Sequence, residues 1–292
     1  MTHRLIAYII AITFNLLPLA AFAAHSEIIP DQFSENAHRM IVGTLADARD
    51  GAITGPKKIQ ISDQAVLDLP KNYVFVPAEA ASAYMSAIGN KTRDSFIGLI
   101  MPKVDNNWFI AINVDKSGYI NTLNAKHLTT NNLLANIKQN IAAENKENVK
   151  QGLPVYSMVD WSIKPTFNTE KKILTFGVIA HNTPDQDKTV NDVAVLFGRD
   201  GVLRLNLVTV RAAYAEDKTH LPVMIDAIHF NAGKTYADFV ANQDTIATYD
   251  VTTFVTGIIP DNQTSPFAKY WWTILFIPLL FIGFKMTTKK GN

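Results

Sequence analysis

Residues 190–210 read VNDVAVLFGRDGVLRLNLVTV, two apolar runs separated by the segment GRDG at 198–201. Both runs are rich in valine and leucine, and two glycines around an aspartate are typical of a tight turn. The stretch therefore predicts two strands, 190–198 and 202–210, joined by a tight turn.

The pattern on either side of this stretch adds strands and a few helices. Alternating or short apolar runs predict strands near 57–69 and at 73–76, 95–101, 108–114, 155–163 and 173–180, with a strand end at 229–230. A 3.6-residue period predicts helices at 31–49, 78–88, 124–150, 222–228 and 244–255. Because the strands cluster and the helices do not alternate with them, we predict an α+β fold: a largely antiparallel sheet with inserted helices.

The composition narrows the class of protein. The chain has 292 residues, of which 48% are hydrophobic and 18% charged, with 27 basic and 26 acidic residues and no cysteine. These values exclude a disordered or collagen-like chain, a multi-span membrane protein and a strongly basic nucleic-acid binder. The missing cysteines exclude disulfides, thiolate nucleophiles and cysteine-ligated metals.

Residues 1–23 are typical of a secretory signal peptide. Arg4 precedes an apolar run that Pro18 interrupts, and Ala21 and Ala23 fit the small-residue pattern of a cleavage site. We predict cleavage before Ala24. The alternative is an uncleaved anchor over 5–24, which is just long enough to cross a bilayer.

The other end of the sequence predicts a membrane anchor. The uncharged run 270–284 is flanked by Lys269 and Lys285 and begins with a tyrosine and two tryptophans, which suit the headgroup level. Since this run would rise only roughly 22 Å as a helix, its flanks must extend it, and we predict a transmembrane helix over 266–286. A buried core helix is the alternative. The lysines beyond the span favour a cytoplasmic stub, 287–292.

The two ends frame an exported α+β domain over 24–265. Residues 24–268 carry 22 basic and 26 acidic residues, a net charge of −4, and no basic stripe, so we predict no nucleic-acid partner. We predict a single-pass protein of the bacterial inner (cytoplasmic) membrane, with the bulk of the chain in the periplasm and the lipid bilayer in contact with the C-terminal helix.

Several short fragments line up in order and spacing with a known family. The most specific is GKTYADF at 233–239, and FGRDG at 197–201, Trp161 with Pro165, and Asp244 also match. The chain thereby resembles an uncharacterised family of membrane-anchored bacterial proteins, known only as a domain of unknown function. The resemblance covers about residues 50–258. It implies a signal peptide and a C-terminal anchor, and it brings no established activity.

Three positions depart from that family's pattern. Asn148 stands where the family usually has Arg, and Phe167 and Asn168 stand where it usually has Tyr-Asp. If those polar groups take part in a reaction in the family, this chain would have an impaired activity. If they are structural, the three departures would have little effect on function.

One segment imitates a calcium loop. Asn113, Asp115 and Ser117 take its first, third and fifth positions, but Asn124 replaces the bidentate glutamate at the twelfth, and a strand enters in place of a helix. We predict a hairpin turn at 115–118 instead.

The histidines form no recognised metal motif. No two of them share a helical face, and the least unfavourable local cluster is His181, Asp185 and Asp187 in a predicted loop. We therefore predict no metal and no cofactor, and keep these three residues as weak metal candidates.

Tyr236, Asp238 and Asp244 are the weak catalytic candidates. A tyrosine and two carboxylates close in sequence suit acid–base chemistry. Carboxylates near a turn more often cap the next helix, and Asp244 suits the N-cap of the predicted helix 244–255.

The sequence carries no catalytic signature that decides its function. We predict a membrane-anchored envelope protein whose exported domain is non-enzymatic and binds a protein partner or a second copy of itself. The first alternative is a membrane-tethered, hydrolase-like enzyme with a site assembled from dispersed Asp, His and Tyr residues. The second is a periplasmic module that binds a small ligand.

Overall fold

The computed structural model describes residues 31–251, apart from 89, 91, 105–107, 124, 126–129, 152–154, 156–157 and 182–187. The predicted signal peptide (1–23), anchor (266–286) and stub (287–292) lie outside the described residues. Within the described part, none of the helices is both long and apolar enough to cross a membrane.

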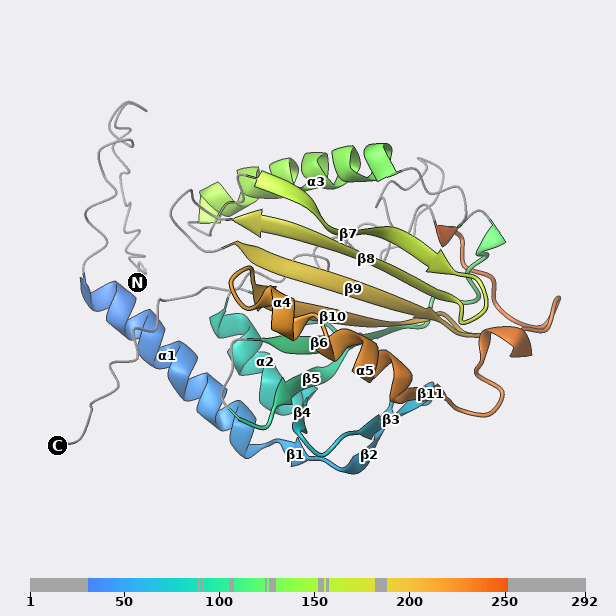
Figure 1. Cartoon of the computed structure of the whole chain (residues 1–292), viewed down its shortest axis with the longest axis horizontal. Coiled ribbons are helices and arrows are strands. Elements are labelled where there is room, and N and C mark those ends of the chain that lie inside the picture. Colours follow the sequence, from blue (N-terminus) through green and yellow to red (C-terminus); the bar gives the residue numbers. More distant parts are fainter. Residues whose placement is uncertain are drawn as a thin grey trace, which may run out of the picture.

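The described strands form a large antiparallel sheet and a small one (Figure 1). The large sheet has eight strands in the order β1 (Ile53–Thr54), β4 (Tyr73–Pro77), β5 (Phe96–Pro102), β6 (Phe109–Asp115), β10 (Val202–Val210), β9 (Thr189–Phe197), β8 (Ile173–His181) and β7 (Met158–Asn168). The small sheet has the order β11 (Ile228–Phe230), β3 (Ala65–Leu69), β2 (Lys57–Ile61). Together with the helices these sheets confirm the predicted α+β class.

The predicted strand pair at 190–210 forms the centre of the large sheet. Strands β9 and β10 pair in register from Thr189 with Val210 to Phe197 with Val202. The turn between them closes where the Gly198 amide donates to the Gly201 carbonyl over 2.8 Å. Both strands are buried along their whole length, because other elements cover both faces of the sheet.

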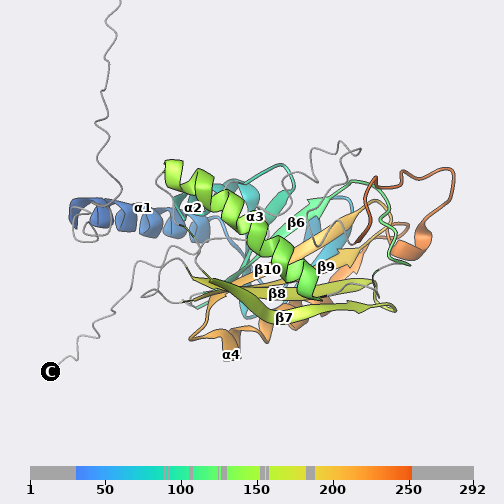
Figure 2. The ribbon, with the colours of Figure 1, turned by 90° about the horizontal axis from the view of Figure 1, so that it is seen from above.

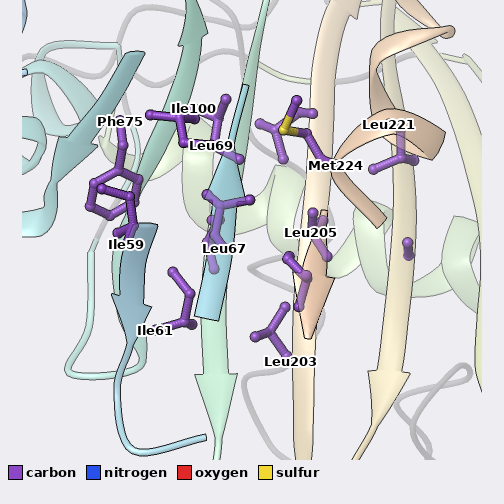
Figure 3. Close-up of a cluster of buried hydrophobic side chains, with 14 of the residues drawn as sticks. Ile59, Ile61, Leu67, Leu69, Phe75, Ile100, Leu203, Leu205, Leu221 and Met224 are labelled. Carbon is purple, nitrogen blue, oxygen red and sulfur yellow. The ribbon is translucent and has the colours of Figure 1, made fainter. Parts of the chain in front are cut away.

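One face of the large sheet packs against the small sheet and is called the small-sheet face here. Leu203, Leu205 and Leu207 of β10 contribute to this core with residues of β2 and β3 and with Leu221 and Met224 (Figure 3). The last two come from α5 (His220–Asp226), which follows the short helix α4 (Tyr214–Asp217). The alternation of strand side chains thus directs every second residue of β10 into one core.

The opposite face is covered by three helices and is called the helix face here (Figure 2). Helices α1 (Asp31–Asp50) and α2 (Ala78–Ala87) cover the β4–β5 end. Helix α3 (Thr130–Gln151) lies over the other end, where Ile137 and Ile141 pack on Val178 and Ala180 of β8.

Several predicted boundaries are wrong. Strand β7 continues through Pro165 to Asn168, since it is the outermost strand of the sheet and has a register shift beside the proline. Helix α3 begins at Thr130, six residues after its predicted start. Ile228, predicted to end a helix, begins β11 because its partner Leu67 places it in the small sheet.

Two further predictions of local structure are wrong. Residues 115–118 form no hairpin, because β6 pairs with β5 and β10, while the chain after it forms a parallel bridge between Tyr119 and Ile246. Residues 244–250 are not helical; the backbones of Thr245 and Ala247 are instead hydrogen-bonded to that of Tyr119. The rest of the predicted helix 244–255, beyond Val251, lies outside the described residues.

Candidate functional site

The three catalytic candidates lie at one end of the large sheet, next to the β9–β10 turn. The link is Arg199 in that turn, whose guanidinium donates to both carboxylate oxygens of Asp244, from Nε over 2.8 Å and from the terminal nitrogen over 2.7 Å. The Val240 amide also donates to Asp244 over 2.7 Å. This ion pair is the first cause of the lowered pKa of Asp244. Asp244 is therefore a partner of Arg199, and the predicted helix N-cap is wrong.

Asp238 fixes a short turn of helix. It is the last residue of the 3₁₀-helix Tyr236–Asp238, and it accepts hydrogen bonds from the Thr235 hydroxyl over 2.6 Å and the Thr235 amide over 2.8 Å. These two bonds lower the pKa of its carboxyl. Asp238 thus completes a capping box within its own 3₁₀-helix, in which Thr235 is the N-cap residue.

Tyr236 also uses its hydroxyl for structure. It donates to the Ile120 carbonyl over 3.1 Å and accepts from the Thr122 amide over 3.2 Å. Its ring lies 4.5 Å from that of Tyr119, which stacks at 3.9 Å on Phe239. The structure thus gathers the three candidates in one corner, where their polar groups hold loops together in place of an open acid–base pair.

The same corner exposes a set of apolar and aromatic side chains. Ile246 is 58% exposed, Leu123 80% and Val240 38%. They flank the stacked aromatic residues, since Ile246 bridges to Tyr119, Leu123 follows Thr122, and Val240 follows Phe239. We call the following six residues the corner patch: Tyr119, Leu123, Tyr236, Phe239, Val240 and Ile246.

A first buried polar cluster lies on the small-sheet face. The Ser162 hydroxyl donates to Asp192 over 2.6 Å, and burial raises the pKa of this carboxyl. Farther along, the Thr209 hydroxyl donates to Asp217, whose carboxyl pKa burial also raises. These bonds attach β7 and α4 to the central strands.

His220 extends this cluster toward β4 and β6. Its Nδ1 is 2.9 Å from the Tyr73 hydroxyl, and its ring stacks on Trp108 at 4.3 Å. Burial lowers the pKa of His220, which favours the neutral ring. The contacts place His220 as a packing residue between α5 and the sheet.

A second buried polar cluster lies on the helix face. The Tyr249 hydroxyl donates to Asp115 over 2.7 Å and lies 2.7 Å from Ser117. Arg204 is buried nearby, which lowers its pKa to about 10 and leaves it charged at neutral pH. Asn113 and Asp115, the first residues of the imitated calcium loop, are buried in β6.

Sequence reasoning missed both buried clusters. The hydrogen-bonded partners come from different parts of the chain, and two members, Asp192 and Arg204, lie in the largely apolar stretch 190–210. A charged residue inside a strand that is otherwise apolar on both faces is the signal that could have found them.

The metal candidates stay a prediction. His181 is the last residue of β8, while Asp185 and Asp187 lie outside the described residues. Among the side chains that the structure describes, no three His, Asp or Glu groups gather closely enough to hold a metal ion.

Among the described residues, helix α1 packs on the domain through its C-terminal half. Ile41 and Leu45 pack on the core beside α2, and Ala48 is fully buried. Toward the N-terminus the helix extends beyond the sheet (Figures 1 and 2), where Met40 is 53% exposed and Val42 41%. The helix therefore presents apolar side chains away from the body of the domain.

Comparisons with known proteins identify a family whose function is unknown. A family model described as "Protein of unknown function (DUF2167)" matches residues 53–284. No curated protein matches the chain. Among solved structures, cyanobacterial PsbP (CyanoP) from Synechocystis sp. PCC 6803 is similar with 9% identity and a TM-score of 0.37, over 62% of this chain and 91% of that chain. The Saccharomyces cerevisiae Ran-binding protein Mog1p is similar with 12% identity and a TM-score of 0.32, over 64% and 100%. TM-scores below 0.5 do not establish a common fold.

Proposed function

Since the chain belongs to DUF2167, a family of proteins of unknown function, we propose a function from its own sequence and geometry. It is a membrane-anchored protein of the bacterial envelope, and its α+β domain faces the periplasm. This domain binds a protein partner through helix α1 and carries out no reaction of its own.

The two ends of the sequence support the anchored topology. Residues 1–23 carry the pattern of an export signal, and 266–286 carry an apolar segment with lysines at both ends. The exported part has a net charge of −4 by sequence, in contrast to the basic residues after the anchor. This asymmetry favours a cytoplasmic C-terminus.

One observation supports the binding function: helix α1 exposes the apolar side chains of Met40 and Val42. Most of the stability of a helix in a protein comes from packing of its apolar face, and the described packing of α1 on the domain is made by its C-terminal half, through Ile41, Leu45 and Ala48. Its apolar periodicity continues in the sequence from Leu45 and Ile41 back through Ala37 to Phe33. An amphipathic helix of this kind fits an apolar groove on another protein.

The role of the corner carboxylates supports a binding domain over an enzyme. Asp244 is held by Arg199 and Asp238 by Thr235, and both have lowered pKa values. A general acid at neutral pH needs a raised carboxyl pKa, so neither residue suits that role.

Site-specific photo-crosslinking in cells tests the proposal. A benzoylphenylalanine is placed in the full chain at Met40, at Val42 and, as the control, at Val223 of α5, which is 44% exposed. We expect a protein adduct of one discrete mass from the two α1 positions and none from the control. An adduct of twice the chain's mass identifies the partner as a second copy.

Two outcomes would contradict the proposal. One is the absence of any protein adduct at both α1 positions, or an adduct with lipid alone. The other is an equal yield from Val223, which would mark the α1 adducts as random collisions. Met40→Glu supplies a second check, because it should reduce the Val42 adduct while the circular dichroism spectrum stays unchanged.

A further inference from the structure

The corner patch carries an inference that rests on the proposed anchoring. We propose that this patch lies on the periplasmic surface of the bilayer that holds the anchor, with its side chains at the headgroup level. The domain then rests on the membrane by this corner, and α1 points away from it.

The chemistry of the patch suits the membrane interface. Tyrosine has an apolar ring and a polar tip, and is enriched where lipid meets water. Here Tyr119 and Tyr236 lie beside Phe239, and the exposed Leu123, Val240 and Ile246 add aliphatic surface. The Lys172 ammonium lies 5.2 Å from the Tyr236 ring centroid, where it can approach lipid phosphates.

The patch is held in a fixed shape. The Arg199–Asp244 ion pair and the Thr235–Asp238 bonds fix the loop that carries Tyr236, Phe239 and Val240. Gly118 has φ +98°, and a Cβ there would lie 2.6 Å from the Thr245 carbonyl oxygen, so glycine allows the 118–119 and 245–246 segments to meet. A rigid apolar surface loses little conformational entropy when it binds.

The position of the patch in the chain favours lipid as its occupant. The described chain ends at Val251, close to the patch, since Ile246 and Ala247 are bound to Tyr119. From there 14 residues, 252–265, lead to the predicted anchor at 266. Among the residues that the structure describes, the patch is therefore the exposed apolar surface nearest in sequence to the predicted anchor.

Helix α1 lies at the end of the molecule that is remote from the corner patch. Figure 1 places α1 at the end of the domain away from residues 231–251. Strand β7 alone, with 11 residues, spans roughly 36 Å between the two ends. A domain that rests on the corner patch thus leaves α1 accessible to a protein partner.

Depth-dependent quenching of a fluorophore tests this placement. The full chain contains no cysteine, so Ile246→Cys and, as the control at the far end, Met40→Cys each give one labelling position. Both are labelled with a nitrobenzoxadiazole dye and reconstituted in vesicles of phosphatidylethanolamine and phosphatidylglycerol. We expect doxyl-labelled lipids to quench the dye at position 246 and to leave the dye at position 40 unchanged.

Flotation of the same vesicles separates the two proposals. A chain that floats with the vesicles at alkaline pH but shows no quenching at 246 overturns the membrane placement and leaves the anchoring intact. A chain that fails to float overturns the anchoring. A blue-shifted dye at 246 without quenching shows that protein covers the patch, which also overturns the lipid proposal. Leu123→Cys, labelled in the same way, should reproduce the result for Ile246→Cys.

Discussion

Gly177 shows how closely one residue controls the packing of the large sheet. A Cβ at this position would overlap both the Asp192 carboxylate and the Ser162 hydroxyl. These two groups are hydrogen-bonded over 2.6 Å across the empty position. The missing side chain is therefore what allows the outermost strand β7 to reach the buried Asp192.

Gly177→Ala should lower the free energy of unfolding by about 1–3 kcal/mol, the usual cost of overpacking. Urea unfolding of the two proteins measures the difference. Gly43→Ala is the matched control, because a Cβ at Gly43 meets nothing within 4 Å and alanine is favoured over glycine in a helix by about 1 kcal/mol. A Gly177→Ala protein as stable as the parent would refute this description of the contact.

At the residue scale, the sequence indicated which polar residues gather in the corner better than it indicated which ones meet in the interior. Tyr236, Asp238 and Asp244 could be proposed together because they are neighbours in the chain, and the structure keeps them in one corner. The contact of Ser162 with Asp192 joins residues 30 positions apart. No local pattern specifies such a contact, so the sequence could mark Asp192 as a charge in an apolar strand but could not identify its partner.

Helix α4 shows how a short element is held by buried polar contacts. It has only four residues, and its Asp217 accepts a hydrogen bond from Thr209 of β10. Burial is the first cause of the raised pKa of this carboxyl. The folded protein therefore holds the Asp217 proton to a higher pH than the unfolded chain does.

Asp217→Asn should change the pH dependence of stability. A raised folded-state pKa stabilises the fold fully below the ordinary value of 3.8 and loses that contribution as the pH rises through the folded pKa. Asparagine keeps the acceptor for Thr209 but does not titrate. The stability of the parent relative to the variant should thus fall as the pH rises above 3.8, measured by urea unfolding over a series of pH values from acid to neutral. A constant difference across this range would contradict the raised pKa.

At the element scale, periodicity located most elements, and tertiary contacts decided the exceptions. Helix α1 and strand β10 were predicted within one residue of their bounds. Residues 244–250 have a helical pattern, but the backbone bonds of 245 and 247 to Tyr119 hold them in another conformation. Strand β7 runs through Pro165 to Asn168, past its predicted end at 163, because the outermost strand of a sheet tolerates a residue without an amide hydrogen.

At the scale of the whole molecule, the sequence predicted the fold class but not the strand order. Alternation of apolar residues indicates which face a residue occupies, while it leaves the partner strand undetermined. The placement of β6 beside β10, and of β2, β3 and β11 in a separate sheet, depends on long-range packing. The resulting domain places α1 and the corner patch at opposite ends, which suits one end for a partner and the other for the membrane (Figure 1).

The anchored topology is the premise of both proposals, and fusions of alkaline phosphatase to the full chain test it most directly. The enzyme is active only in the periplasm, so fusions after Pro260 and after Lys290 report on either side of the predicted anchor. We predict an active enzyme after Pro260 and an inactive one after Lys290. Activity after Lys290 with none after Pro260, or the same activity at both positions, would contradict a single-pass anchor with a periplasmic domain.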